Sequence, residues 1–256
     1  GARPCALPNY CPNVCAHYHA HSVCYVRQGG ISCQVRKKLI GFAVTAKLFA
    51  GAVLDNLLKL GHRRKAVDHE LSLVTEWLLC ASSQISVPYF LLPVAGAEDP
   101  QYRERVYCYE LYHRWRCHWS DGFPFSLSGE VDKKGHPLIP GDWKPDFLVH
   151  VPGQMTNLLI VEVKPANADR ARMINDLKKL TYFRRDLKDQ DDNLANYYAA
   201  YFWLYGLAMN DWPSLRDELL AALQDSADFD RALVSCIVHE APGVRALRAQ
   251  WDDTGC

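Results

Sequence analysis

Two carboxylates and a lysine stand at the ends of two apolar segments, where side chains of these types could hold a divalent metal ion. Pro145-Asp146 begins one segment, and Glu162-Val163-Lys164 ends the other, sixteen residues after the aspartate. Two carboxylates in close contact are costly to keep ionised unless a cation lies between them. Mg²⁺ and Mn²⁺ prefer such oxygen ligands. A bound ion of this kind can polarise a phosphoryl oxygen, while a nearby ammonium stabilises the developing charge.

The spacing of these groups predicts a β-hairpin that brings them onto one face. Residues 146–151 and 158–163 favour strands, and the residues between them supply turn chemistry. With the hairpin centred near Gln154, Asp146 lies directly opposite Glu162, and opposed Cβ atoms are about 4.5–5.5 Å apart. Lys164 follows on the same face, whereas a slip of one residue would separate the two carboxylates. The alternate positions then point into a core: Phe147, Val149, Val151, Val161 and Val163.

These residues resemble the motif of the PD-(D/E)-X-K nuclease superfamily, which Pro145-Asp146 and Glu162-Val163-Lys164 match. The resemblance covers about Tyr102–His239 and implies a restriction-endonuclease-like fold, in which helices flank a mixed β-sheet in the order α-β-β-β-α-β. It implies a metal-dependent nuclease that acts mostly on DNA. It also implies that the main-chain carbonyl of Val163 is a further metal ligand and that Glu110, on the preceding helix, completes the metal site.

Each of these residues also has an ordinary structural interpretation. Asp146 could simply begin a strand, and Glu162 with Lys164 could form cross-strand ion pairs on a solvated face. Glu110 stands four residues before Arg114, which is the spacing of a helical ion pair. The coincidence of Pro-Asp, a hairpin and Glu-X-Lys at the end of an apolar strand favours the metal site.

The segments around the motif predict an α/β core that follows a helical first half. The apolar patterns predict helices at 39–60, 66–82, 102–119, 168–187 and 214–223, and further strands at 125–132, 197–204 and 232–238. A strand-helix-strand order after the hairpin implies parallel pairing beside the antiparallel pair. In the predicted strand at 125–132, Glu130 and Asp132 are either further acids of the site or a charged strand end before a turn.

The predicted organisation has three parts: an N-terminal segment at 1–38, a helical segment at 39–100 and the nuclease-like core at 101–256. Five of the ten cysteines and three histidines lie in the first part: Cys5, Cys11, Cys15, Cys24, Cys33, His17, His19 and His21. Thiolate and imidazole are the ligands of structural Zn²⁺, although no double Cys-X-X-Cys pattern is present. The alternatives are a poorly ordered tail or, in an oxidising compartment, a disulfide framework. Four later cysteines lie within helical or strand patterns and are expected to be small buried residues: Cys80, Cys108, Cys117 and Cys236.

Composition restricts how such a protein could bind nucleic acid. The 256 residues are 49% hydrophobic and carry 29 basic and 29 acidic side chains, so the net charge is zero. Affinity for phosphates must therefore come from local patches, for which the arginines and lysines of 103–116 and 170–188 are candidates. Acidic residues in the second stretch make a solvated helical face an equal alternative. The best apolar run, 39–54, is broken by Lys47 and two glycines, so we expect no membrane segment and a cytoplasmic protein.

The sequence thus predicts a Mg²⁺- or Mn²⁺-dependent hydrolase of phosphodiester bonds whose partner is nucleic acid, with DNA expected from the resemblance. In this hypothesis Asp146 and Glu162 bind the metal, Glu110 completes or buffers its ligand set, and Lys164 positions water or stabilises the transition state. Two alternatives stay open. One is a module of the same fold that binds nucleic acid or assembles without cutting, and the other is a small-molecule metal hydrolase with the same acidic pair.

Overall fold

The computed structural model describes residues 65–129, 143–189 and 191–252, most of which belong to the second of two compact units, Val67–Cys256. The helices are 65–82, α2 (Val87–Phe90), α3 (Glu104–Arg116), α4 (Arg170–Arg185) and α5 (Trp212–Leu223), with a short 3-10 helix, η1 (Met209–Asp211). The strands are β1 (Ser126–Gly129), β2 (Phe147–His150), β3 (Asn157–Pro165), β4 (Ala199–Tyr205), β5 (Ser235–His239) and β6 (Leu247–Ala249).

The six strands form one mixed sheet in the order β1-β2-β3-β4-β5-β6. The β1-β2, β2-β3 and β5-β6 pairs are antiparallel, while β3-β4 and β4-β5 are parallel. Each parallel pair needs a crossover connection, and α4 and α5 supply the two crossovers. The predicted α/β class and the predicted mixture of parallel and antiparallel pairs are confirmed. Along the chain, the elements of this core follow in the order α3-β1-β2-β3-α4-β4.

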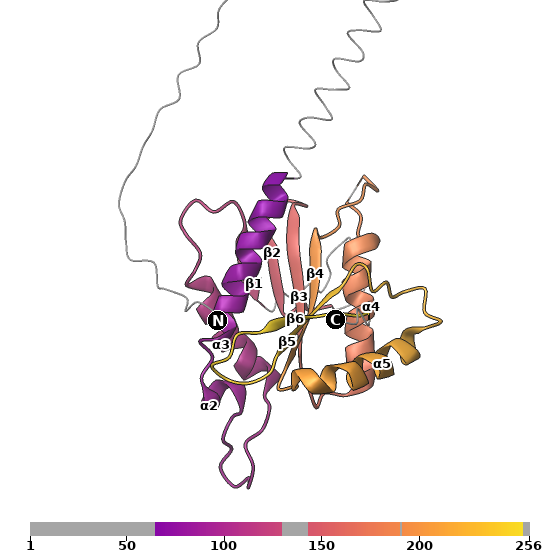
Figure 1. Cartoon of the computed structure of the whole chain (residues 1–256). Coiled ribbons are helices and arrows are strands. Elements are labelled where there is room, and N and C mark those ends of the chain that lie inside the picture. Colours follow the sequence, from indigo (N-terminus) through magenta and orange to yellow (C-terminus); the bar gives the residue numbers. More distant parts are fainter. Residues whose placement is uncertain (1–64, 130–142, 190, 253–256) are drawn as a thin grey trace, which may run out of the picture. The chain divides into compact units, whose positions relative to one another are not determined.

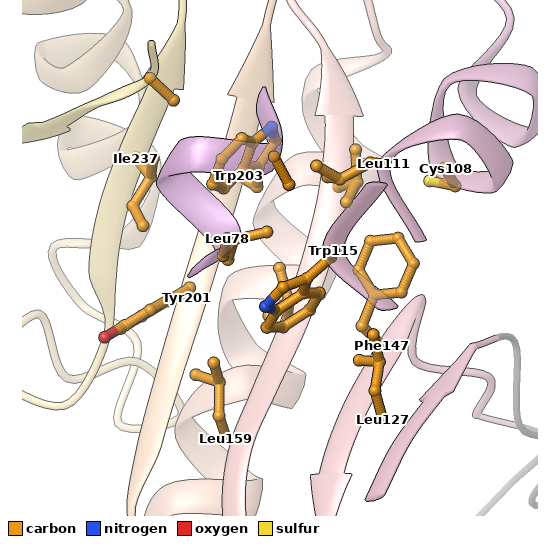
Figure 2. Packing of buried hydrophobic residues seen from close by; sticks show 14 of the residues in the cluster. Leu78, Cys108, Leu111, Trp115, Leu127, Phe147, Leu159, Tyr201, Trp203 and Ile237 are labelled. Atoms are coloured by element: carbon orange, nitrogen blue, oxygen red, sulfur yellow. The ribbon is translucent and has the colours of Figure 1, made fainter. Parts of the chain in front are cut away.

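Helices cover both faces of the sheet (Figure 1). The helix at 65–82 packs with α2 and α3 on one face, where Leu78, Leu111 and Trp115 meet Phe147 and Trp203 in a buried cluster (Figure 2). The helices α4 and α5 cover the other face through a second buried cluster: Met173, Leu177, Leu180, Leu215 and Leu219. Since β3 is buried on both faces, its sequence is an almost continuous apolar run rather than an alternating one.

The hairpin has the register that the sequence predicts. Phe147 pairs with Val161 and Leu148 with Ile160, while a bulge between Val149 and His150 shifts the pairing nearer the turn. Phe147, Val149, Val161 and Val163 lie in the cluster beneath α3, and Leu148 and Ile160 lie in the cluster beneath α4. The face that carries the charged groups is therefore covered by a helix along most of its length.

Several features differ from the sequence-based expectations. Residues on both sides of the predicted division near residue 100 share one core, since Val74 and Leu78 pack in the same cluster as Leu111. The short elements α2 and β6 were not predicted. Cys117 is exposed rather than buried, because it is the C-cap of α3, beyond the helix's last buried position, Trp115. The predicted helix at 39–60 and the cysteine- and histidine-rich segment at 1–38 lie outside the described residues, as do Glu130 and Asp132.

Candidate active site

The three motif residues meet at one end of the sheet. Asp146 directly precedes β2, and Glu162 and Lys164 lie near the carboxyl end of β3, where the antiparallel half of the sheet meets the parallel half. One step beyond the Phe147–Val161 pair, the observed register sets Asp146 opposite Glu162. Since side chains alternate along a strand, Glu162 and Lys164 share a face. The predicted hairpin geometry is thus present.

Asp146 is half-buried and held by the backbone of the neighbouring strand. The main-chain N–H of Val163 donates a hydrogen bond of 2.7 Å to Asp146 Oδ2. Burial raises the pKa of Asp146 to about 6, although Lys164 and the Val163 N–H act in the opposite direction and favour the carboxylate. The remaining contributions raise the pKa further, and they come from two other acids, Glu104 and Asp176. A cation placed beside this carboxyl would lower its pKa and favour the ionised form.

Glu162 is the most deeply buried acid of the site, with 3% of its surface exposed. Its Oε1 atom has no hydrogen-bond partner among the described residues. Burial raises the pKa of Glu162 well above its ordinary value, and repulsion from Asp146 and Asp176 raises it further, while Lys179 and Lys164 oppose the shift. A buried carboxylate oxygen without a partner is costly, so this position is suited to a cation or a proton.

The ammonium of Lys164 is held by groups from both sides of the sheet end. Its Nζ atom lies 3.1 Å from Glu104 Oε2, on the first residue of α3, and 3.2 Å from Asp176 Oδ2, in the second turn of α4. It also donates a hydrogen bond of 2.9 Å to the main-chain carbonyl of Val163. That carbonyl is the one that the resemblance assigns as a metal ligand, so the lysine and a metal ion would share it.

The charge of Lys164 is strongly favoured by its surroundings. Burial alone would lower its pKa, but attraction to the nearby carboxylates outweighs burial and raises the pKa above its usual range. In order of effect these carboxylates are Asp176, Asp146, Glu104 and Glu162. A lysine in this environment stays protonated at neutral pH. It can stabilise negative charge but is poorly suited to remove a proton.

Glu110 lies away from this cluster. Its Oε1 atom accepts a hydrogen bond of 2.6 Å from Arg114 Nε, so the helical ion pair that was the alternative interpretation is formed. Successive helical residues are rotated by about 100°, which puts Glu110 roughly 160° around α3 from Cys108 and from Tyr112. Those two residues line the pocket beside Asp146. The structure therefore brings Asp146, Glu162 and Lys164 together and directs Glu110 elsewhere.

Two acids outside the motif join the site in its place. Glu104 reaches Lys164 from α3, and Asp176 reaches it from α4, where Asp176 Oδ1 also accepts a hydrogen bond of 2.6 Å from Lys179 Nζ. The sequence does contain a signal for each. Glu104 is three residues before the buried Tyr107, and Asp176 stands among inward-facing apolar residues of a predicted helix, so both lie on sheet-facing sides.

A buried polar chain lies among the aromatic residues beneath α3. The indole N–H of Trp203 donates to the hydroxyl of Tyr107 at 2.8 Å, and the same hydroxyl shares a hydrogen bond of 2.7 Å with His239 Nδ1. The ring of Tyr205 stacks on that of Tyr107 at 3.9 Å between centroids. Burial lowers the pKa of His239 to about 4, although the backbone of Val244 and Ala241 raises it in part.

The donor set of the site suits a divalent cation in charge and in chemistry. Four carboxylates, Glu104, Asp146, Glu162 and Asp176, surround two ammonium groups, Lys164 and Lys179, which leaves an excess of two negative charges when all are ionised. The unpartnered oxygen of Glu162 is a free donor position within that set. In the described part of the chain, however, no three histidine, cysteine, aspartate or glutamate side chains are already arranged around a common point as a metal site. Fewer than three such side chains would therefore contact the ion in this arrangement.

Comparisons of the chain with known protein families, with curated proteins and with solved structures found no match. None of the helices in the described ranges combines the length and apolar content that a bilayer crossing requires.

Proposed function

We propose that this protein is a metal-dependent nuclease that hydrolyses phosphodiester bonds in DNA. The observation that carries the proposal is the buried, unpartnered carboxylate of Glu162, opposite Asp146 and beside the fixed ammonium of Lys164. A structural salt-bridge cluster would leave no charged oxygen without a partner, because burial makes such an oxygen costly. A hydrolytic site needs one donor position left open for a cation.

The residues of the site have different roles in the proposed reaction. Asp146 and Glu162 would hold Mg²⁺ or Mn²⁺, with the main-chain carbonyl of Val163 as a further oxygen donor. When bound, such an ion polarises a phosphoryl oxygen and acidifies a water molecule. Lys164 stays protonated and stabilises the negative charge that develops on the phosphate. Glu104 and Asp176 fix the position of the Lys164 ammonium from two directions.

Basic side chains beside Asp146 supply local attraction for a phosphate backbone. Arg105 and Lys144 line a small pocket of about 200 Å³ together with Glu104 and Asp146. Because the net charge of the whole chain is zero, a few such contacts would carry the electrostatic part of binding. Affinity should therefore fall with salt less steeply than it does for a protein that contacts many phosphates.

A second candidate function is binding of nucleic acid without cleavage. The observation that favours it is the set of contacts made by Lys164, whose ammonium engages two carboxylates and the Val163 carbonyl. An ammonium held in this way contributes to catalysis only if a phosphate can replace one of its partners. A cleavage assay separates the two functions.

The test uses the full chain with linear, circular and single-stranded DNA and with RNA, in Mg²⁺, Mn²⁺ or EDTA. We expect cutting that requires a metal and is lost in Asp146→Ala and Lys164→Ala. The exposed Glu98, changed to Gln, is the control and should cut as the unmodified protein does. Thermal melting of every variant shows whether it is folded. Absence of cutting with either metal on every substrate, or full activity in folded Asp146→Ala, would overturn the nuclease proposal.

A further inference from the structure

Two pockets of different character share Asp146. The first is the charged pocket of Glu104, Arg105 and Lys144 described above. The second has a volume of about 320 Å³ and is lined mainly by aromatic side chains and a glycine: Tyr109, Tyr112, Phe147 and Gly129, with Cys108 and Asp146. A pocket of this size is at the lower end of the range that holds small organic groups. A charged and an aromatic pocket therefore meet at an acid of the proposed metal site.

The aromatic pocket has a formed wall and an exposed tyrosine. The rings of Tyr112 and Phe147 lie nearly parallel, with an interplanar angle of 18° and centroids 6.5 Å apart. The hydroxyl of Tyr112 donates a long hydrogen bond of 3.4 Å to the main-chain carbonyl of Leu127. Gly129 carries no side chain there, and a Cβ atom on it would approach the Tyr112 ring to 3.2 Å. Tyr109, another of the lining residues, keeps 57% of its surface exposed.

We infer that this aromatic pocket binds an unpaired nucleobase of the strand whose phosphate lies at Asp146, and that Tyr109 stacks on that base. The inference rests on the proposed function and specifies its substrate as single-stranded or locally unpaired nucleic acid. A nucleotide has the same two-part chemistry as the two pockets, since an anionic phosphate is joined to a planar aromatic ring. Arg105 and Lys144 complement the phosphate, and the tyrosines complement the base.

The pocket selects an unpaired base over a paired one for a geometric reason. In a duplex both faces of each base are covered by its neighbours, so an aromatic side chain cannot stack on one without first unstacking it. A single strand offers those faces freely, and stacking on tyrosine is tolerant of sequence because every base has a π-face. Charge complementarity favours the same ligand, because the positive charges of Arg105 and Lys144 beside Asp146 attract an anionic strand more than an uncharged apolar group.

The test is binding rather than cleavage, so that it does not depend on catalysis. Fluorescence anisotropy in EDTA measures the affinity of the full chain for a labelled single-stranded DNA. Changing Tyr109→Ala should weaken this binding by roughly 5- to 150-fold, which corresponds to about 1–3 kcal/mol for one stacked base. Tyr109→Phe keeps the ring and should bind as the unmodified protein does. Tyr89→Ala is the matched control, because Tyr89 is an exposed tyrosine (44%) that lines neither pocket.

A strand that lacks bases at its central positions separates stacking from charge. The unmodified protein should bind this abasic strand about as weakly as Tyr109→Ala binds the complete one, and a single-stranded RNA of the same sequence shows whether the sugar matters. The inference is overturned if Tyr109→Ala binds the complete strand normally, or if the unmodified protein binds duplex as well as single strand.

These outcomes also separate the inference from the nuclease proposal. Normal binding by Tyr109→Ala together with metal-dependent cutting would refute the base-binding pocket and support the nuclease proposal. Loss of binding in Tyr109→Ala without cutting by any preparation would support the base-binding pocket and refute the nuclease proposal.

Discussion

Replacing Glu162 with glutamine should stabilise the metal-free protein, which is an unusual result for a change at a buried motif residue. The substitution keeps the size of the side chain but removes a charge that has an unpartnered oxygen and repels Asp146 and Asp176. A buried polar group without a partner costs about 1–3 kcal/mol, and a charged one costs more. The introduced glutamine would still be polar and buried, so we expect a net gain of at least about 1 kcal/mol in the free energy of unfolding.

The gain should depend on pH in a definite direction. Because the pKa of Glu162 is raised in the folded protein, the unfolded chain loses this proton first as the pH rises. The contribution of Glu162 to stability is therefore complete below about pH 4.5, the ordinary value, and is lost as the pH rises through the folded pKa. The variant and the unmodified protein should have similar stability at pH 4.5, and their difference should grow by about 1.4 kcal/mol for each unit of pKa shift.

Thermal melting at pH 4.5 and pH 8, in EDTA and in Mg²⁺, measures both effects. A gain of 1 kcal/mol corresponds to a rise of about 2–4 °C in the melting temperature of a protein of this size. Magnesium at 100 times its dissociation constant should stabilise the unmodified protein by about 2.7 kcal/mol, and this gain should be largely absent in Glu162→Gln. Glu98→Gln is the control at an exposed site. If Glu162→Gln melts at a lower temperature than the unmodified protein at pH 8, or if Mg²⁺ stabilises both equally, the reasoning is refuted.

Three further predictions concern the buried polar chain and the acids of α3. Tyr107→Phe leaves the indole N–H of Trp203 and Nδ1 of His239 without their partner. Urea denaturation should therefore show that the free energy of unfolding falls by about 2–4 kcal/mol, and a fall of less than about 1 kcal/mol would contradict a stabilising role for these hydrogen bonds. Since the pKa of His239 is lowered to about 4, its contribution to stability is full above about pH 6.5, and the free energy of unfolding falls by roughly 3 kcal/mol as the pH drops to 4. His239→Gln should flatten this pH dependence in urea titrations, and an unchanged dependence in the variant would refute the role of His239 in it. In the cleavage assay Glu104→Gln should lower the rate at least about tenfold, because the Lys164 ammonium loses one of the two carboxylates that fix its position. Glu110→Gln should keep the rate within about twofold, and a larger loss in Glu110→Gln than in Glu104→Gln would return Glu110 to the site.

The hairpin was predictable because its geometry depends on a period of two. Once the turn is centred near Gln154, the face of every residue in β2 and β3 follows, including those of Asp146 and Glu162. The bulge between Val149 and His150 was not predictable, but it lies on the turn side of the site and leaves the register of the two acids unchanged. The prediction that Asp146 and Glu162 share a face therefore depended on the alternation of side chains along the strands.

The acids contributed by helices were harder to predict, because the rotation of a helix over a sheet is set by tertiary packing. Glu110 lies near the middle of a predicted helix and was chosen by the resemblance, yet its partner is Arg114. Glu104 lies at the helix end, where a side chain can reach around the edge of the packed layer toward Lys164. The sequence pattern places Asp176 on the inward-facing side of its helix, but it does not indicate that Asp176 reaches Lys164 from the opposite layer.

The position of Lys164 between α3 and α4 links ligand binding to the cohesion of the fold. One ammonium holds the first turn of one helix and the second turn of another, on opposite faces of the sheet. An anion that draws this ammonium toward itself weakens both ion pairs, so part of its binding energy is spent in loosening the two layers. By thermodynamic reciprocity, a substitution that tightens either ion pair should weaken anion binding by the same factor. Amide hydrogen exchange in the first turn of α3 and the second turn of α4 would then report on an anion bound at the sheet end.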